Sequence, residues 1–140
     1  MALVLDTGVV FAALNGDDPA HAACRRLLES AGERLVVPDP VLVELDYLLR
    51  RTARAETWLT FCQAIEDGAF DLQAMNPTLL LAAARIQAKY DDFPLGFVNA
   101  AVFATCEALG ETKVATLDRR HFSVLRTEDG STLDLLPVAE

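Results

Sequence analysis

Residues 99–118 decide the fold, and they read Asn-Ala-Ala-Val-Phe-Ala-Thr-Cys-Glu-Ala-Leu-Gly-Glu-Thr-Lys-Val-Ala-Thr-Leu-Asp. Small and apolar side chains recur there at helical spacings of three and four, and they predict one buried helix face: Val98, Ala101, Val102, Thr105 and Leu109. Gly110 then ends the helix, because glycine adopts the conformation of a helix terminus without steric cost. Residues 113–117 predict a short buried strand. Asp118 therefore follows the carboxyl end of a strand, where open α/β folds bind their ligands.

The rest of the chain alternates predicted strands with predicted helices. Strands are expected at residues 3–5, 34–37, 70–74 and 132–136, and helices at 9–14, 19–31, 40–51, 55–67 and 77–89. Three of these helices begin with a capping side chain followed by proline, at Asp18-Pro19, Asp39-Pro40 and Asn76-Pro77. The alternation predicts an α/β fold, with a central, mainly parallel sheet of about five strands covered by helices on both faces. Residues 1–140 contain no repeat or linker, so a single domain is expected.

Composition limits the classes of function. The chain has 140 residues, of which 52% are hydrophobic, and its formal net charge is −9. The high apolar content is consistent with a partner surface, although a tightly packed core is the more ordinary explanation. The acidic balance argues against a protein that coats nucleic acid, but it does not exclude an enzyme whose acids hold cations. Basic residues are grouped, as at Arg50, Arg51 and Arg54.

Cysteine usage and hydropathy point to a cytoplasmic protein. Cys24, Cys62 and Cys106 are odd in number and widely spaced, so neither a zinc site nor a disulfide framework is indicated. Each is expected as a small buried thiol in a helix. The first apolar run is cut by Asp6 and lacks a basic flank, so it is not a signal peptide. No run approaches the roughly 20 apolar residues of a membrane span.

Three acids occupy positions where a carboxylate is unexpected. Asp6 and Asp118 each end an apolar strand, and Glu44 lies on an apolar helix face with Val41 and Leu48. If the three converge, each close pair of like charges costs roughly 4 kcal/mol at ~4 Å and an effective dielectric constant near 20. Such a cluster is stable only around a cation. Oxygen ligands without histidine or cysteine favour Mg²⁺ or Mn²⁺.

Each acid also has a simpler interpretation when it is taken alone. Asp6 could accept backbone N–H groups at the end of its strand. Glu44 could pair with an arginine such as Arg26 or Arg85. Asp118 could cap the turn that follows it. Three acids at the ends of buried elements are harder to explain as three independent caps.

Four segments together resemble the PIN-domain ribonucleases, and specifically the VapC toxins of bacterial VapBC toxin–antitoxin pairs. They are Val-Leu-Asp-Thr-Gly at 4–8, Val-Leu-Val-Glu-Leu-Asp-Tyr-Leu-Leu at 41–49, Pro-Leu-Gly-Phe-Val-Asn-Ala-Ala at 94–101 and Ala-Thr-Leu-Asp-Arg-Arg-His-Phe at 115–122. The resemblance extends along the whole chain in length, element order and motif spacing. It implies a three-layer α/β/α PIN-like domain.

The acidic site of this family falls on Asp6, Glu44, Asn99 and Asp118, which the resemblance makes the catalytic and metal-binding residues. Family members usually have aspartate at the position of Asn99. The amide keeps the shape but loses a negative charge, so weaker metal binding and weaker activity are expected. Asn99 is either a natural variant or a deliberate isosteric substitution that silences a toxic nuclease, and the isosteric change favours the second. Gly8 stands where serine is common, so a hydroxyl contact there is in doubt.

The resemblance implies the toxin of a type II toxin–antitoxin system, a Mg²⁺- or Mn²⁺-dependent endoribonuclease that cleaves tRNA or rRNA and leaves 3′-hydroxyl and 5′-phosphate ends.

Arg119 and Arg120 are candidate RNA-binding residues, or simply exposed arginines on a turn. His121 is interpreted mainly as a structural histidine near Phe122. A VapB-type antitoxin, covering the helices at 41–49 and 58–65, and a homodimer are the expected partners. The alternative is a non-catalytic PIN-fold binding module that acts through its antitoxin complex. A phosphatase of the haloacid dehalogenase type is disfavoured, because Gly8 stands where its second aspartate belongs.

Overall fold

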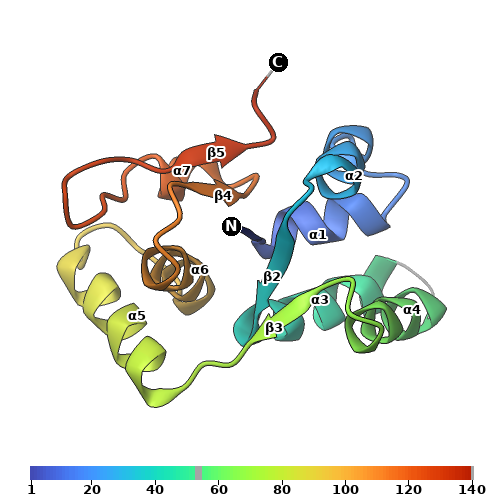
Figure 1. The fold of residues 1–140 in the computed structure, drawn as a ribbon, viewed down its shortest axis with the longest axis horizontal. Helices are drawn as coiled ribbons and strands as arrows, with labels where there is room; N and C mark the ends of the chain where they lie inside the picture. Colours follow the sequence, from blue (N-terminus) through green and yellow to red (C-terminus); the bar gives the residue numbers. More distant parts are fainter. Residues whose placement is uncertain (53–54, 140) are drawn as a thin grey trace.

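The computed structural model describes residues 1–52 and 55–139, and within them strands and helices alternate as expected. Figure 1 shows a sheet in the middle of the molecule, with α5 and α6 on one side and α1 to α4 on the other. The elements are β1 (Ala2–Val4), α1 (Thr7–Leu14), α2 (His21–Ser30), β2 (Arg34–Pro38), α3 (Asp39–Thr52), α4 (Ala55–Glu66), β3 (Asp71–Gln73), α5 (Pro77–Lys89), α6 (Phe97–Ala108), β4 (Lys113–Ala115), α7 (Arg119–Phe122) and β5 (Asp134–Leu136).

The strands form two parallel groups that meet at one bridge. In one group β2 lies between β1 and β3, and in the other β4 pairs with β5. A parallel bridge between Leu5 and Ala115 joins the groups, and the N–H of Asp6 donates to the carbonyl of Ala115 at 2.9 Å. The strand order is therefore β3-β2-β1-β4-β5. The predicted three-layer α/β/α fold, with about five mainly parallel strands, is confirmed.

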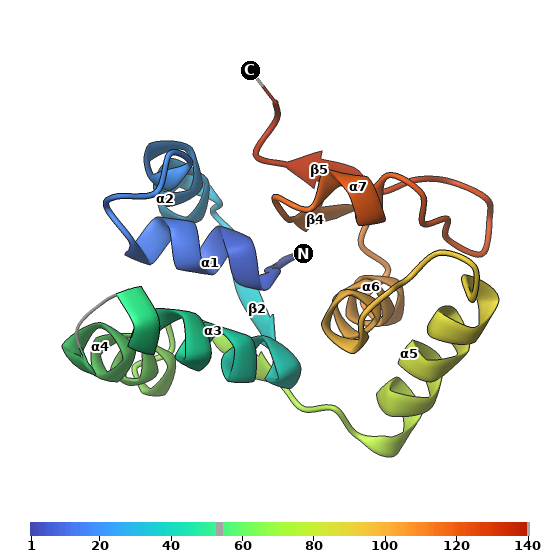
Figure 2. The same ribbon diagram turned by 180° about the vertical axis from the view of Figure 1, so that it is seen from behind.

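Helix α6 is buried on all sides, whereas its sequence predicted one buried face. Every residue from Ala100 to Cys106 is buried. The helix lies between the sheet and α5, as Figure 2 shows from behind, so both of its faces are covered. The helix contains many alanines, and alanine occurs at both buried and exposed positions. The spacing of apolar side chains therefore predicted fewer buried residues than the structure has. Gly110 ends the helix at φ +68°, as predicted.

The three predicted helix caps have different outcomes. Asn76 caps α5 as expected, accepting the N–H of Leu79 at 2.9 Å. The prediction at Asp18 is wrong, because its carboxylate accepts the N–H of Ala20 at 2.8 Å in a turn and α2 begins only at His21. Helix α3 begins at Asp39, but that carboxylate accepts the N–H of Met75 at 3.2 Å. Short polar side chains bond to whichever backbone group is nearest, and tertiary packing decides which one that is.

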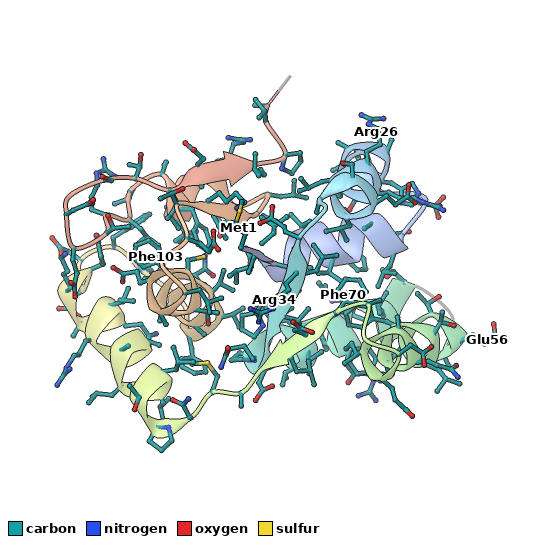
Figure 3. All side chains as sticks on the ribbon, viewed as in Figure 1. Met1, Arg26, Arg34, Glu56, Phe70 and Phe103 are labelled. Carbon is teal, nitrogen blue, oxygen red and sulfur yellow. The ribbon has the colours of Figure 1, made fainter. Side chains whose placement is uncertain are left out.

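Aromatic and aliphatic side chains fill the space between the layers. Figure 3 labels Phe70 where the chain leaves α4, and its ring centroid lies 5.0 Å from that of Phe61. Two of the predicted thiols, Cys24 and Cys106, are buried in helices, and Cys62 is half-buried. In the part of the chain that the structure describes, no helix is long and apolar enough to cross a membrane.

Candidate active site

A cavity of about 560 Å³ opens at the carboxyl ends of β1 and β4. All four residues of the predicted site line it, together with five neighbours: Asp6, Thr7, Gly8, Glu44, Tyr47, Leu48, Asn99, Leu117 and Asp118. Because β1 and β4 are adjacent and parallel, the residues that follow them emerge at the same edge of the sheet. Helices α3 and α6 add Glu44 and Asn99. The fold thus brings four segments that are distant in sequence to one cavity.

Two threonines connect the three acids in a continuous hydrogen-bond network. The hydroxyl of Thr7 donates to Oε1 of Glu44 at 2.6 Å, while the N–H of Thr7 donates to Oδ1 of Asp6 at 2.9 Å. The hydroxyl of Thr116 donates to Oδ2 of Asp6 at 2.7 Å and accepts the N–H of Asp118 at 3.0 Å. Both threonines are buried. Their oxygens therefore fix the positions of the acids relative to one another.

Among the three acids of the site, Asp118 accepts hydrogen bonds from the largest number of groups. Nδ2 of Asn99 donates to its Oδ2 at 2.9 Å, and the N–H of His121 donates to its Oδ1 at 3.1 Å. Nδ1 of His121 lies 2.9 Å from both carboxylate oxygens, and Nε2 lies 2.9 Å from the carbonyl oxygen of Pro94. The imidazole stacks on Phe93, with ring centroids 5.1 Å apart, rather than on Phe122. His121 thus connects Asp118 to the loop that precedes α6.

The two strand-end aspartates have pKa values shifted in opposite directions. Burial raises the pKa of Asp6, and the nearby Glu44 and Asp118 carboxylates add to that shift, although hydrogen bonds from Thr116 and Thr7 oppose it. Burial alone would also raise the pKa of Asp118, but hydrogen bonds from His121 and Asn99 outweigh it and lower that pKa. Pairs of acids whose environments separate their pKa values are typical of catalytic sites.

The simpler interpretations of the acids are partly correct. Asp6 does accept a backbone N–H, and Asp118 does cap α7. Neither role removes these side chains from the cavity. The environment predicted for Glu44 is wrong, because the residue is exposed at the rim while Val41, Leu45 and Leu49 form the buried face of α3. Among residues 1–52 and 55–139, no arginine forms an ion pair with Glu44, so pairing with Arg26 or Arg85 is excluded there.

The donor set suits a hard divalent cation in its chemistry. Carboxylate oxygens of Asp6, Glu44 and Asp118 line the cavity with the amide of Asn99, and oxygen ligands are those that Mg²⁺ and Mn²⁺ take. In the described residues, however, no three His, Cys, Asp or Glu side chains are gathered closely enough to hold a metal ion. Several of these oxygens instead accept hydrogen bonds from the hydroxyls of Thr7 and Thr116 and from the amide of Asn99.

The two candidate RNA-binding arginines do not line the cavity. Nη2 of Arg119 donates to the carbonyl of Pro137 at 2.6 Å and so holds the C-terminal segment. Arg120 is exposed on α7. At Gly8 an added Cβ would lie 3.7 Å from Cβ of Leu117, an ordinary contact distance. Arg54 lies outside the described residues.

Sequence reasoning missed several residues of the site. Thr7, Thr116 and Tyr47 were not predicted to belong to it, and His121 was given only a packing role. The available signal was position, since Thr7 follows Asp6 directly and Thr116 lies two residues before Asp118, on the same face of an extended chain.

The PIN domain family matches this chain over residues 3–127. The chain belongs to the PIN-domain family. It is 32% identical over 135 residues to Ribonuclease VapC26 of Mycobacterium tuberculosis, an alignment that covers 96% of this chain and 100% of that protein. The relationship to VapC toxins inferred from the four motifs is thereby confirmed, and this PIN domain is of the VapC ribonuclease type.

Solved structures show the same fold. VapC20 of M. tuberculosis, described as a toxin that cleaves the sarcin–ricin loop, superposes with a TM-score of 0.73 at 22% identity, covering 81% of this chain and 87% of that one. VapBC2 of Rickettsia felis, bound to a promoter DNA fragment, gives 0.68 at 14% identity, with coverage of 96% and 97%. DNA-bound VapBC of Salmonella typhimurium gives 0.68 at 17% identity, with 96% of each chain covered.

Proposed function

We propose that this PIN domain is the toxin of a type II toxin–antitoxin system, a cytoplasmic endoribonuclease that uses Mg²⁺ or Mn²⁺ to hydrolyse phosphodiester bonds of tRNA or rRNA, and that Asn99 weakens it. The observation that carries the proposal is the convergence of Asp6, Glu44, Asn99 and Asp118 on one cavity. The 32% identity to Ribonuclease VapC26 supports the reaction class, and the fold shared with a sarcin–ricin loop nuclease is consistent with an RNA substrate.

Each site residue has a distinct role in the proposed reaction. Asp6, Glu44 and Asp118 would hold the cation, and Thr7 and Thr116 position these three acids. A bound divalent cation supplies an activated water and stabilises the charge that develops on the phosphate. Arg119 and Arg120, at the exit of β4, would contact the RNA backbone further from the cavity.

The hydrogen bond between Asn99 and Asp118 supports the proposal that an amide at this position weakens metal binding. Nδ2 of Asn99 donates a hydrogen bond to Oδ2 of Asp118 at 2.9 Å and so stabilises the charge of that carboxylate without any metal. An aspartate there would bring two carboxylates together, a repulsion of roughly 4 kcal/mol at ~4 Å that a cation relieves. With aspartate at position 99, the repulsion between the two carboxylates would be relieved by a cation. With asparagine there, a hydrogen bond stabilises Asp118 instead.

Restoring the acid tests the proposal. The Asn99→Asp protein is expected to cleave tRNA or rRNA in the presence of Mg²⁺ or Mn²⁺, to leave 5′-phosphate ends and to slow growth when it is expressed. Adding Asp6→Ala to Asn99→Asp should abolish both effects, and chelation should stop cleavage. Mapping RNA ends in cells that express Asn99→Asp would identify the substrate.

An inactive Asn99→Asp protein, folded and loaded with Mn²⁺, would contradict the nuclease assignment. It would favour the non-catalytic binding module that acts through its antitoxin complex.

A VapB-type antitoxin and a second copy of the chain are the proposed partners. The matched folds of R. felis and S. typhimurium come from VapBC complexes, which supports an antitoxin. The expected surface on α3 and α4 exposes three large apolar side chains, Val43 at 74%, Tyr47 at 59% and Leu59 at 65%. Light scattering of the chain alone and with its antitoxin would measure both associations.

A further inference from the structure

Tyr47 is an exposed aromatic residue in the wall of the acidic cavity. It lines the cavity together with Glu44 and Leu48, yet it is 59% exposed. The guanidinium of Arg51 lies 5.5 Å from the centroid of its ring, and Nη1 donates to the tyrosine hydroxyl at 3.2 Å. The ring is therefore accessible to a ligand, and the hydrogen bond links it to Arg51.

Tyr47, Arg51 and the acid Glu44 lie along a single face of α3. Glu44, Tyr47 and Arg51 are three and four positions apart, the spacing of neighbours on a helix surface. From Glu44 to Arg51 the helix rises about 10 Å. An acid, an aromatic ring and a cation are thus arranged in this order along the helix, from the cavity outward. The distance that they span is on the scale of one or two nucleotides.

Arg51 and its neighbour Arg50 differ in their ion pairing. Arg50 forms an ion pair with Asp46 at 2.6 Å across one helical turn. Within the described ranges, the guanidinium of Arg51 forms no ion pair, and its hydrogen bond is to a neutral hydroxyl. Arg51 is thus a local positive charge beside an acidic cavity, and a guanidinium binds phosphate oxygens well.

We propose that Tyr47 and Arg51 form a nucleotide subsite, in which the ring stacks on the base adjoining the phosphate in the cavity and Arg51 binds the next phosphate. The proposal rests on the proposed function, because it assumes that RNA enters the cavity. Aromatic rings stack on any base, and arginine binds phosphate whatever the sequence. The subsite therefore selects unpaired nucleotides rather than a particular sequence.

A binding measurement on the chain as it stands tests the subsite without requiring cleavage. The probe is a short single-stranded oligoribonucleotide that contains 2-aminopurine, whose fluorescence is quenched by stacking. Tyr47→Ala should weaken binding about fivefold to a hundredfold and abolish the quenching, while Tyr47→Phe should retain both, because the ring is what stacks. Exposure of Tyr47 means that these variants should fold, which thermal melting would verify.

Arg50 provides a matched control for Arg51. Arg51→Gln and Arg50→Gln change the net charge equally and lie on the same helix, but only Arg51 is proposed to contact phosphate. Arg51→Gln should lower the slope of log Kd against log salt by about 1, and Arg50→Gln should leave it nearly unchanged. A second control is Tyr90→Ala, since Lys89 lies 5.6 Å from that ring centroid and Tyr90 does not line the acidic cavity.

The outcomes separate the subsite from the nuclease assignment. If Tyr47→Ala binds RNA as tightly as Tyr90→Ala does, or if the two arginine variants have equal salt slopes, the subsite is wrong even when Asn99→Asp cleaves RNA. Loss of antitoxin binding with unchanged RNA binding would overturn it in favour of a protein contact. Selective loss of RNA binding and quenching would support it, even if Asn99→Asp proved inactive.

Discussion

The acids at the two edges of the sheet differ in whether they have a lysine or arginine as an ion-pair partner. At the amino edge, Nζ of Lys113 lies 3.0 Å from Oε1 of Glu33 and 3.3 Å from Oε2 of Glu111, and Glu111 also accepts the N–H of Ala2 at 2.8 Å. At the carboxyl edge, Asp6, Glu44 and Asp118 have no lysine or arginine as an ion-pair partner among the described residues. Lys113 thus pairs with the acids at the amino edge, whereas the acids at the carboxyl edge have no such partner.

The pKa shifts follow this difference for Glu111 and Asp6. At the amino edge, the hydrogen bond to Glu33 raises the pKa of Lys113, while contacts with Ala2 and Lys113 outweigh burial and lower the pKa of Glu111. At the carboxyl edge, burial raises the pKa of Asp6, whereas hydrogen bonds from His121 and Asn99 lower that of Asp118. A lowered carboxyl pKa indicates an acid that the fold stabilises in its charged form, and a raised one indicates an acid whose charge the fold does not fully stabilise. The chain therefore stabilises the charge of Glu111 through Lys113, and it leaves the charge of Asp6 only partly stabilised in the cavity.

The largest expected effect is on catalysis. In the Asn99→Asp protein, Asp6→Asn should reduce RNA cleavage by about a hundredfold or more, because the metal loses a ligand that also connects the site through Thr7 and Thr116. Glu111→Gln, the matched change at the amino edge, should leave the initial rate nearly unchanged. Equal losses in the two variants would break the distinction between the edges.

A smaller effect is expected on stability in the presence of metal. Mn²⁺ at about 100 times its Kd should stabilise the Asn99→Asp protein by about 2.7 kcal/mol, measured by thermal or urea unfolding. At the same concentration the stabilisation should be smaller in the Asn99 chain, because its amide already satisfies Asp118. Asp6→Asn should remove it, and Glu111→Gln should retain it. Stabilisation that persists in Asp6→Asn would place the metal elsewhere.

Much of the fold could be predicted because local patterns determine it. Without any family knowledge, the pattern placed Asp6 and Asp118 each at the end of a short apolar strand, but it left open whether the two strands are neighbours. Asn99 could be assigned only through the resemblance, because an asparagine in a helix carries no signal of its own. The roles of Thr7 and Thr116 depend on side-chain rotamers across strand neighbours, which no sequence period encodes.

Two predictions were wrong for different physical reasons. Asp18 bonds to the N–H of Ala20 in a local turn instead of capping α2, which begins only at His21. Glu44 was placed on the apolar face of α3 because a helix face is wide, and its rim position became clear only from what packs on either side.

The smallest expected effect concerns the pH dependence of stability in the absence of metal. Because the pKa of Glu111 is lowered from 4.5, its contribution should be present above that pH and lost as the pH falls through the lowered value. Glu111→Gln should therefore cost about 1 kcal/mol near neutral pH and flatten the acid limb of a urea-unfolding series. Asp6 has the opposite sign: its raised pKa means that stability falls as the pH rises from 3.8 towards the raised value, so Asp6→Asn should cost nothing near neutral pH or even stabilise the chain. Curves of the same sign for the two variants would mean that the acids at the two edges are equally structural, and the case for an external cation at the carboxyl edge would fail.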